Sequence, residues 1–224
     1  YWKAVNVDSD KYTAQAELHQ NHGYFIRAKP GAKVMHPVQA CLYIDTEALA
    51  QNVHNIIIAE EGSELHIITG CTIAPKVKSG LHIGISEFFI KKNARVSFTM
   101  IHNWAEEVAV RPRTGTLVEE NGIFMSNYIC MQPVKSLQMY PAAQLIGENA
   151  IARYNTILFA TKGSNMDVGS RVYLKSKGCK AEVIARTITK GGKIVSRGHL
   201  VGEVAGEKAH LECRGLILQN GGAI

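Results

Sequence analysis

Short runs of alternating apolar and polar residues cover most of the chain after residue 30. Examples are residues 55–59 (NIIIA), 64–69 (ELHIIT), 94–101 (ARVSFTMI) and 181–188 (AEVIARTI). Alternation with a period of two places successive side chains on opposite faces of a strand, and Val, Ile, Thr and Phe favour strands. The pattern predicts an all-β protein.

The first thirty residues lack this alternation. Asp8 or Ser9 has the side chain of a helix N-cap, and the short helix that follows would end before Gly23. We expect residues 1–23 to form an irregular or short helical lead-in, and residues 24–224 to form the core domain.

One kind of turn recurs at nearly constant spacing. Four-residue segments containing Gly or Asn occur seven times, at Pro30–Lys33, Glu61–Glu64, Lys92–Arg95, Glu120–Ile123, Glu148–Ile151, Lys177–Lys180 and Ala205–Lys208. Their Gly or Asn positions step by 31, 31, 28, 28, 29 and 28 residues, and both residue types accept a left-handed backbone at low cost. A fixed turn at this period is typical of a solenoid whose coils each carry two or three short strands. We therefore predict a β-helix, because an antiparallel sandwich or barrel rarely keeps one turn chemistry at one spacing.

Composition and charge narrow the class of protein. The 224 residues are 46% apolar, with no apolar run of membrane-spanning length and no charged-then-apolar leader, so we expect neither a membrane span nor a signal peptide. The formal charge is +6, and residues from Arg171 onward hold ten Lys or Arg against four Glu. Aromatic residues are not interleaved among these basic residues, which argues against a nucleic-acid partner. The first residue is Tyr1 and the last four directly follow a strand-like run, so we expect a piece of a longer protein.

The cysteines and histidines give no recognisable metal motif. Cys41, Cys71, Cys130, Cys179 and Cys213 are an odd number, with no Cys-x-x-Cys pair and no His at finger spacing. This argues against a disulfide framework and a structural zinc site, and it fits a reducing, cytoplasmic setting. Seven histidines have no recurring short-range pairing, and we interpret each as a surface or hydrogen-bonded side chain: His19, His22, His36, His54, His66, His82 and His199.

Residues 209–218 (AHLECRGLIL) hold the last cysteine on a predicted strand. In an extended register Leu211 and Cys213 share one face, and the polar residues between them share the other. We expect the face with Cys213 to be buried and the opposite face to be polar.

Similar offsets from the recurring turns place three side chains on one interior strip. Cys71, Trp104 and Cys213 follow the Gly or Asn of their own turns by nine, eleven and seven residues. Whole coils would separate Cys71 from Cys213, so the two thiols cannot bind one metal ion within one chain. A relay along the interior, or a site shared by two chains, is more natural.

Several short motifs then occur in a recognisable order: Gly70–Pro75, Leu81-His82, Asn103-Trp104, Glu119–Asn121, Tyr140-Pro141, Lys190–Lys193 with Arg197-Gly198, and Glu212–Ile217. With these motifs, the chain from about residue 24 to its end resembles the SufB/SufD (SufBD) core, the scaffold subunits of the Suf iron–sulfur cluster assembly system. The resemblance implies a right-handed parallel β-helix. It also implies a scaffold without its own enzymatic activity that holds a transient iron–sulfur cluster.

The resemblance implies roles for three residues and for several partners. Cys71 matches the cysteine that receives sulfur, Trp104 matches an aromatic position along the interior path, and Cys213 matches the second cysteine, near the partner interface, with a metal-binding role. The implied partners are a SufC-type ATPase bound through a region beyond this chain, a SufB/SufD-like paralogue or a second copy as a homodimer, and a cysteine desulfurase as sulfur donor.

The sequence departs from the family pattern at three places and leaves two alternatives open. Tyr43 stands where the family has Arg, His102 where it has Gln, and Thr114-Gly115 where it has a Lys-Arg pair. A purely structural β-helical module with buried thiols would explain these departures. A polysaccharide-active β-helix enzyme would need an outward strip of acidic residues, and the chain has only four Asp, none of them paired across coils.

Overall fold

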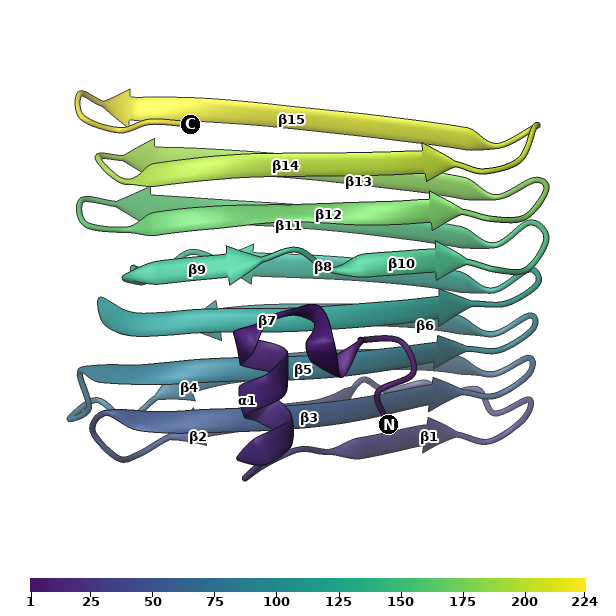
Figure 1. Ribbon diagram of the computed structural model, residues 1–224, viewed down its shortest axis with the longest axis horizontal. Coiled ribbons are helices and arrows are strands. Elements are labelled where there is room, and N and C mark those ends of the chain that lie inside the picture. The colour runs from purple at the N-terminus through teal and green to yellow at the C-terminus, as the bar shows by residue number, and fades with distance from the viewer.

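A computed structural model describes all residues from 1 to 224 and shows two parallel sheets wound into one solenoid (Figure 1). In chain order the elements are η1 (Val7–Ser9), α1 (Lys11–Leu18), β1 (Phe25–Ala28), β2 (Val38–Ile44), β3 (Leu49–Ala59), β4 (Glu64–Ile73), β5 (Ser79–Ile90), β6 (Arg95–Asn103), β7 (Glu107–Val118), β8 (Ile123–Cys130), β9 (Ser136–Met139), β10 (Ala142–Leu145), β11 (Ile151–Thr161), β12 (Asn165–Leu174), β13 (Lys180–Lys190), β14 (Lys193–Gly202) and β15 (Lys208–Gln219).

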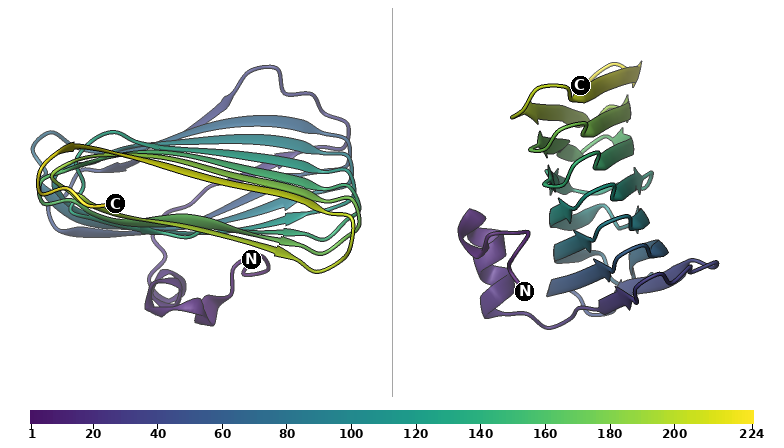
Figure 2. Two further views of the ribbon diagram at one scale, coloured as in Figure 1. Left: turned by 90° about the horizontal axis from the view of Figure 1, so that it is seen from above. Right: turned by 90° about the vertical axis from the view of Figure 1, so that its right-hand side faces the viewer.

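The strands alternate between two sheets that face each other across the interior (Figure 2). One sheet has eight strands, in the order β1-β3-β5-β7-β10-β12-β14 with β9 beside β7 and β12, and the other has seven, in the order β2-β4-β6-β8-β11-β13-β15. In Figure 1 the front strands run to the right and the rear strands to the left as the chain climbs, so the winding is right-handed. The predicted right-handed parallel β-helix is confirmed.

The strands are longer than the sequence pattern predicted. Most coils carry two strands of 8 to 12 residues, and each pairs in register with the next coil over nearly its whole length. The exceptions are the first coil, in which β1 has 4 and β2 has 7 residues, and the coil that contains Tyr140-Pro141, where the strand is divided into β9 and β10. Proline has no N–H to donate to the ladder, and Pro141 lies between the two short strands, whereas Pro112 lies within the continuous strand β7.

The recurring turns form one corner of the solenoid, between each strand of the eight-stranded sheet and the following strand of the other. The predicted left-handed residue has positive φ at all seven: Gly31 (70°), Gly62 (68°), Asn93 (58°), Asn121 (54°), Asn149 (57°), Gly178 (74°) and Gly206 (91°). Amides along this corner bond to the next coil, for example Gly62 N to the Lys92 carbonyl at 2.9 Å and Asn121 N to the Glu148 carbonyl at 2.8 Å. The corner is therefore stacked as regularly as the sheets.

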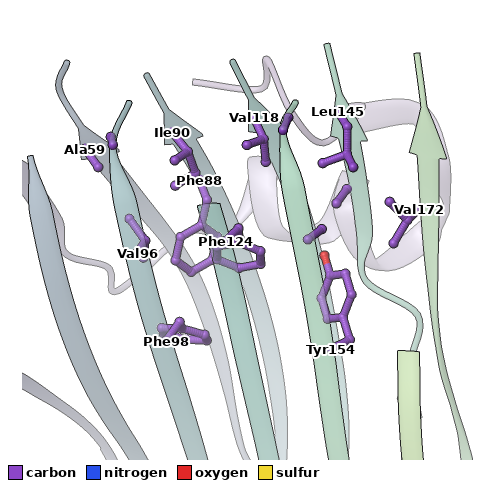
Figure 3. Close-up of a cluster of buried hydrophobic side chains, with 14 of the residues drawn as sticks. Ala59, Phe88, Ile90, Val96, Phe98, Val118, Phe124, Leu145, Tyr154 and Val172 are labelled. Atoms are coloured by element: carbon purple, nitrogen blue, oxygen red, sulfur yellow. The ribbon is translucent and has the colours of Figure 1, made fainter. Parts of the chain in front are cut away.

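Aromatic side chains stack between the sheets at the centre of the larger core cluster (Figure 3). The ring centroid of Phe88 lies 4.8 Å from that of Phe98 and 5.0 Å from that of Phe124, and Phe124 is followed by Tyr154 at 5.9 Å. Phe88 and Phe124 are fully buried, and burying such a side chain contributes about 1.5–3 kcal/mol. The Phe88–Phe98 contact joins the two sheets within one coil, and the contacts of Phe124 with Phe88 and Tyr154 join neighbouring coils.

The N-terminal residues include the predicted short helix, which lies outside the eight-stranded sheet (Figure 2). The helix α1 begins after Asp10 and not after Asp8 or Ser9, which belong to η1. Asp10 Oδ1 accepts hydrogen bonds from the amides of Tyr12 and Thr13, and Thr13 Oγ1 accepts one from the Asp10 amide. Asp10 is favoured because only this candidate has a side chain three residues later that completes a capping box. At eight residues, α1 is the longest helix, and no helix could cross a membrane.

Candidate functional site

Cys71, His82 and His102 form a buried cluster inside the solenoid. Cys71 on β4 and His102 on β6 are register partners on neighbouring strands, and His82 comes from β5 in the facing sheet. Each of the three residues is at most 2% exposed. One potential ligand atom from each residue lies within 4.8 Å of those of the other two.

The sequence does not reveal this cluster directly. His82 is predicted to be a surface or hydrogen-bonded residue, and in the structure it is hydrogen-bonded but buried. His102 stands out in the sequence only as a departure from the family pattern. The feature of the sequence that could have revealed the pair is its spacing. Cys71 and His102 are 31 residues apart, which is also the spacing between successive turns among the first three. Residues one period apart become neighbours when coils stack in register.

Hydrogen bonds to neighbouring side chains occupy one nitrogen of each imidazole ring. His82 Nδ1 lies 2.8 Å from Gln51 Oε1, and the Gln51 amide donates to the Tyr43 carbonyl at 3.2 Å. That second bond leaves Gln51 Oε1 as an acceptor, so His82 Nδ1 carries the proton. His102 Nδ1 lies 2.7 Å from the Tyr128 hydroxyl, while His102 Nε2 is buried without a hydrogen-bond partner. The Nε2 atom of each ring is the one left for other chemistry.

Trp104, which was predicted from the sequence, packs on this cluster. Its ring centroid lies 5.1 Å from that of His82 and 5.4 Å from that of His102, and its indole Nε1 is buried without a hydrogen-bond partner. The structure therefore brings the predicted residues Cys71 and Trp104 to one place, through two histidines that were not predicted there.

Burial sets the protonation states of the cluster. It raises the pKa of the Cys71 thiol to about 12, with a smaller contribution from Cys41, and it lowers the pKa of His82 to about 4. Burial, and then the neighbouring His82, lower the pKa of His102. Near neutral pH the cluster is a neutral thiol beside two neutral imidazoles. A thiol becomes a nucleophile or a metal ligand only after it loses its proton, and imidazoles with pKa values this low do not hold that proton at neutral pH.

Cys213 faces the interior side of β15 but is not buried. It pairs in register with Ala185 on β13, which is 7% exposed, whereas Cys213 is exposed and Leu211 on the same face is 45% exposed. The prediction of a buried face in residues 209–218 is therefore wrong, because β15 is the terminal strand of its sheet and no further strand covers its inner face. Ser196 Oγ lies 3.7 Å from the Cys213 sulfur. Cys213 belongs to no group of three His, Cys, Asp or Glu residues close enough to bind a metal ion.

The two predicted cysteines lie on the same sheet and face the same side of it. Strands β6, β8, β11 and β13 lie between β4 and β15, which places the cysteines about 24 Å apart, at five steps of about 4.8 Å. In register, Cys213 lies two residues before the column that starts at Cys71. The expected common inner wall is present, and the separation prevents the two thiols from binding one metal ion.

Comparison with known proteins identifies the family. Residues 42–224 match the family described as SUF system FeS cluster assembly, SufBD core domain. A protein of Methanothermobacter thermautotrophicus, named an iron–sulfur cluster assembly SufBD family protein, is 52% identical over 98% of this chain and 55% of its own length. A protein of Archaeoglobus fulgidus with the same name is 53% identical over the whole chain and 60% of its own length. A relative in Pyrococcus horikoshii is 30% identical over 98% of this chain and 49% of its own length.

The chain thus spans about half the length of the curated relatives that it matches. The matched family region covers all strands from β3 to β15, and therefore both the buried cluster and Cys213. Together with the parallel β-helix, these matches show that the chain belongs to the SufBD family of iron–sulfur cluster assembly proteins.

Proposed function

We propose that this chain is the core of a scaffold for iron–sulfur cluster assembly, in which Cys71 receives sulfur and Cys213 holds the nascent cluster together with groups from a partner chain. The observation that carries the proposal is the placement of both cysteines on one inner wall, at the buried and the open parts of the same sheet.

Two small voids lie between the sheets in the region that separates the two cysteines, and each is lined mostly by apolar surface with several hydroxyl-bearing residues. The first has a volume of about 20 Å³ and is lined by Tyr128, Thr156 and Ser170 among others. The second has a volume of about 10 Å³, shares Thr156 and Ser170, and extends to Thr187 and Ser196. One water-sized probe needs about 10–15 Å³, so each void has room for about one small polar species.

Residues that line the voids contact residues at both ends of the proposed route. Tyr128 bonds to His102 of the buried cluster, and Ser196 contacts the sulfur of Cys213. Of the departures from the family pattern, Thr114 lines the first void with a hydroxyl. Tyr43 is 51% exposed and contacts the cluster only through its carbonyl, which accepts from Gln51.

Sulfur receipt at Cys71 balances as a thiol exchange. The Cys71 sulfur attacks the terminal sulfur of a donor persulfide R–S–SH while its proton passes to the departing donor sulfur, so the donor leaves as R–SH. One S–S bond breaks and one forms, so no external oxidant or reductant is needed. Transfer onward spans four strands, and Cys130 on β8, one strand beyond His102 in the same column, offers an intervening interior thiol.

The inner face of the last coil is where we place the proposed partner chain. Ile217 on this face is 54% exposed and Leu211 is 45% exposed, and a SufB/SufD-like paralogue or a second copy of the chain is proposed to contact it and to supply further ligands to Cys213. A cysteine desulfurase in the cytoplasm is the proposed sulfur donor. A SufC-type ATPase is proposed to bind through the part of the full-length protein that lies outside this chain, so the scaffold itself needs no enzymatic activity.

Persulfide mapping on the full-length protein tests this function. The protein is incubated without oxygen with a cysteine desulfurase and cysteine, and persulfides are located by alkylation and mass spectrometry. We expect label on Cys71 and Cys213, loss of both in Cys71→Ser, and loss of only the second in Cys213→Ser. Cys179→Ser is the matched control, because Cys179 is buried away from the cluster and bonds to backbone carbonyls.

Undiminished label on Cys213 in the Cys71→Ser variant would disprove the order of transfer. Reconstitution with iron and sulfide should also give a thiolate-to-iron absorption band that disappears in Cys213→Ser. A protein that takes up neither persulfide nor cluster would be a structural module with packed thiols.

A further inference from the structure

We propose that Cys71, His82 and His102 form a binding site for one borderline-soft divalent metal ion of the Zn²⁺ type, within the interior of a single chain. This site differs from the cluster position proposed at Cys213 in location and in composition. The inference does not depend on the proposed scaffold function, since it rests on the donor atoms alone.

The donor set suits such an ion. One cysteine sulfur and two imidazole nitrogens are typical ligands of Zn²⁺ and of related ions, and three protein ligands with an open fourth position are the usual form of a non-structural zinc site. The three residues come from three strands, β4, β5 and β6, of two sheets. Their donors converge from both sides of the interior, as a tetrahedral centre requires.

The surroundings of the histidines are those of metal ligands. A ligating histidine usually donates its second ring N–H to a carbonyl, carboxylate or other acceptor, which fixes the tautomer and the ring orientation. Gln51 Oε1 serves His82 in this way at 2.8 Å, and the Tyr128 hydroxyl is 2.7 Å from His102 Nδ1. The Gln51 side chain is oriented in turn by its hydrogen bond to the Tyr43 carbonyl. The orientation of His82 is therefore fixed through two successive hydrogen bonds.

The structure leaves atoms and space for the ion. His102 Nε2 and Trp104 Nε1 are buried without hydrogen-bond partners, and an unsatisfied buried polar group costs about 1–3 kcal/mol. A metal bond to His102 Nε2 would remove one of these costs. At Gly84, a Cβ would lie 2.8 Å from His82 Nε2, so the absence of a side chain there keeps this nitrogen accessible.

The distances require only a small closure. Donors bound to Zn²⁺ at about 2.0–2.3 Å in a tetrahedron lie roughly 3.3–3.6 Å from one another. The three donors here lie within 4.8 Å of one another. Side-chain rotation of about 1 Å brings them to bonding distance, and such a movement needs no change in the strands that hold them.

Cobalt binding tests the site, since Co²⁺ takes the place of Zn²⁺ and reports its ligands by absorption. The full-length protein is reduced, freed of metal by a chelator and titrated with Co²⁺. We expect one equivalent to bind, with a thiolate-to-cobalt charge-transfer band and the intense visible bands of a tetrahedral ion, and we expect Zn²⁺ to displace it. Cys71→Ser should abolish the charge-transfer band, and His102→Gln should weaken binding at least tenfold.

Two further variants separate ligation from general damage to the interior. Gln51→Leu removes no ligand but removes the hydrogen bond to His82 Nδ1, together with the bond from Gln51 to the Tyr43 carbonyl, and it should weaken binding about 10–100-fold. Cys179→Ser changes a buried thiol that lies outside the cluster and bonds only to backbone carbonyls, and it should bind Co²⁺ like the unchanged protein. Circular dichroism confirms that each variant keeps its β structure.

An unchanged charge-transfer band in folded Cys71→Ser, or the absence of stoichiometric binding by the unchanged protein, would overturn the inference. The persulfide experiment tests the proposed scaffold function separately, and its result does not depend on the result of cobalt binding. Sulfur mapping at Cys71 and Cys213 can succeed when cobalt does not bind, and cobalt can bind when no persulfide reaches Cys213.

Discussion

At the scale of single residues, Glu87 links the N-terminal segment to the solenoid. Its carboxylate is fully buried on β5 and accepts the backbone amides of Trp2, Lys3 and Ala4 at 2.5–2.6 Å, and it lies 2.8 Å from His54 Nε2. Burial raises the pKa of Glu87, but the bonds from His54 and from the amides outweigh it and lower the pKa to about 2, from a usual value of 4.5. The charged form is the one that holds the segment.

Acid should therefore release the N-terminal segment before the solenoid unfolds. Because the folded-state pKa of Glu87 is depressed, its stabilising contribution is complete above about pH 4.5 and is lost as the pH falls toward about 2. Glu87→Gln should weaken docking at neutral pH by about 1.5–3 kcal/mol, the usual range for hydrogen bonds to a charged group. Hydrogen exchange at the amides of Lys3 and Ala4 measures both effects.

The control for this prediction is Glu47→Gln, because Glu47 also accepts two backbone amides but lies on an exposed turn far from the N-terminus. It should leave exchange at Lys3 and Ala4 unchanged. Exchange rates that, after correction for intrinsic chemistry, stay constant from neutral pH to pH 3 in the unchanged protein would contradict the role of Glu87.

Residue-level chemistry was only partly predictable from the sequence. Alternation within residues 209–218 predicted the inward face of Cys213, because the face of a residue depends on its own strand, and the offset from the recurring turn predicted an interior position for Cys71. Neither feature identified the pairs His54 with Glu87 or His82 with Gln51, because each pair joins neighbouring coils about 31 to 33 residues apart. Identifying them requires the register between coils, and the repeat alone gives that register only to within a residue or two.

At the scale of elements, the corners were predicted fully and the strands only in part. A left-handed corner needs one residue that tolerates positive φ, which is a local property visible in Gly and Asn. Strand length depends on pairing with the coils on both sides, and a proline alone does not predict a break, since Pro112 lies within β7 whereas Pro141 lies between β9 and β10.

The asparagine corners give a test of this local rule. Asn121 has φ of 54°, and its side-chain amide donates to Asn93 Oδ1 at 3.2 Å. Asn121→Gly should be nearly neutral, since glycine accepts the conformation although the side-chain bond is lost. Asn121→Ala should lower the free energy of unfolding by about 1–2 kcal/mol, the cost of a left-handed backbone for an ordinary residue.

Denaturant unfolding of the two variants measures the difference. Thr99→Ala is the control, because Thr99 accepts a similar side-chain bond from Asn127 at 3.2 Å but lies in the regular strand β6. If Asn121→Ala is no less stable than Asn121→Gly, backbone strain does not set the choice of residue at the corners.

At the scale of the whole molecule, the coils stack in chain order along the solenoid axis, so residues far apart in sequence can lie on the same wall. Cys71 and Cys213 are far apart in the chain but lie on one wall, which the repeat made predictable. The exposure of Leu211 and Cys213 was not predictable in the same way, since burial in a solenoid is supplied by the adjacent coil and not by the residue's own strand. Strand β15 has the alternating sequence of a strand with an interior face, but no adjacent coil covers that face.

The inner face of β15 therefore leads us to expect self-association of the 224-residue chain. Leu211 and Ile217 would be interior residues in any other coil, yet they are 45% and 54% exposed beside an unpaired strand edge, and both features favour contact with a second copy. Sedimentation over a range of concentrations should show a dimer, and Leu211→Lys should raise its dissociation constant at least tenfold, because a charge would enter the apolar contact. Leu18→Lys makes the same change on α1, where Leu18 is 76% exposed, and should leave the dimer intact. A chain that stays monomeric at high concentration, or a dimer that tolerates Leu211→Lys, would contradict self-association through this face.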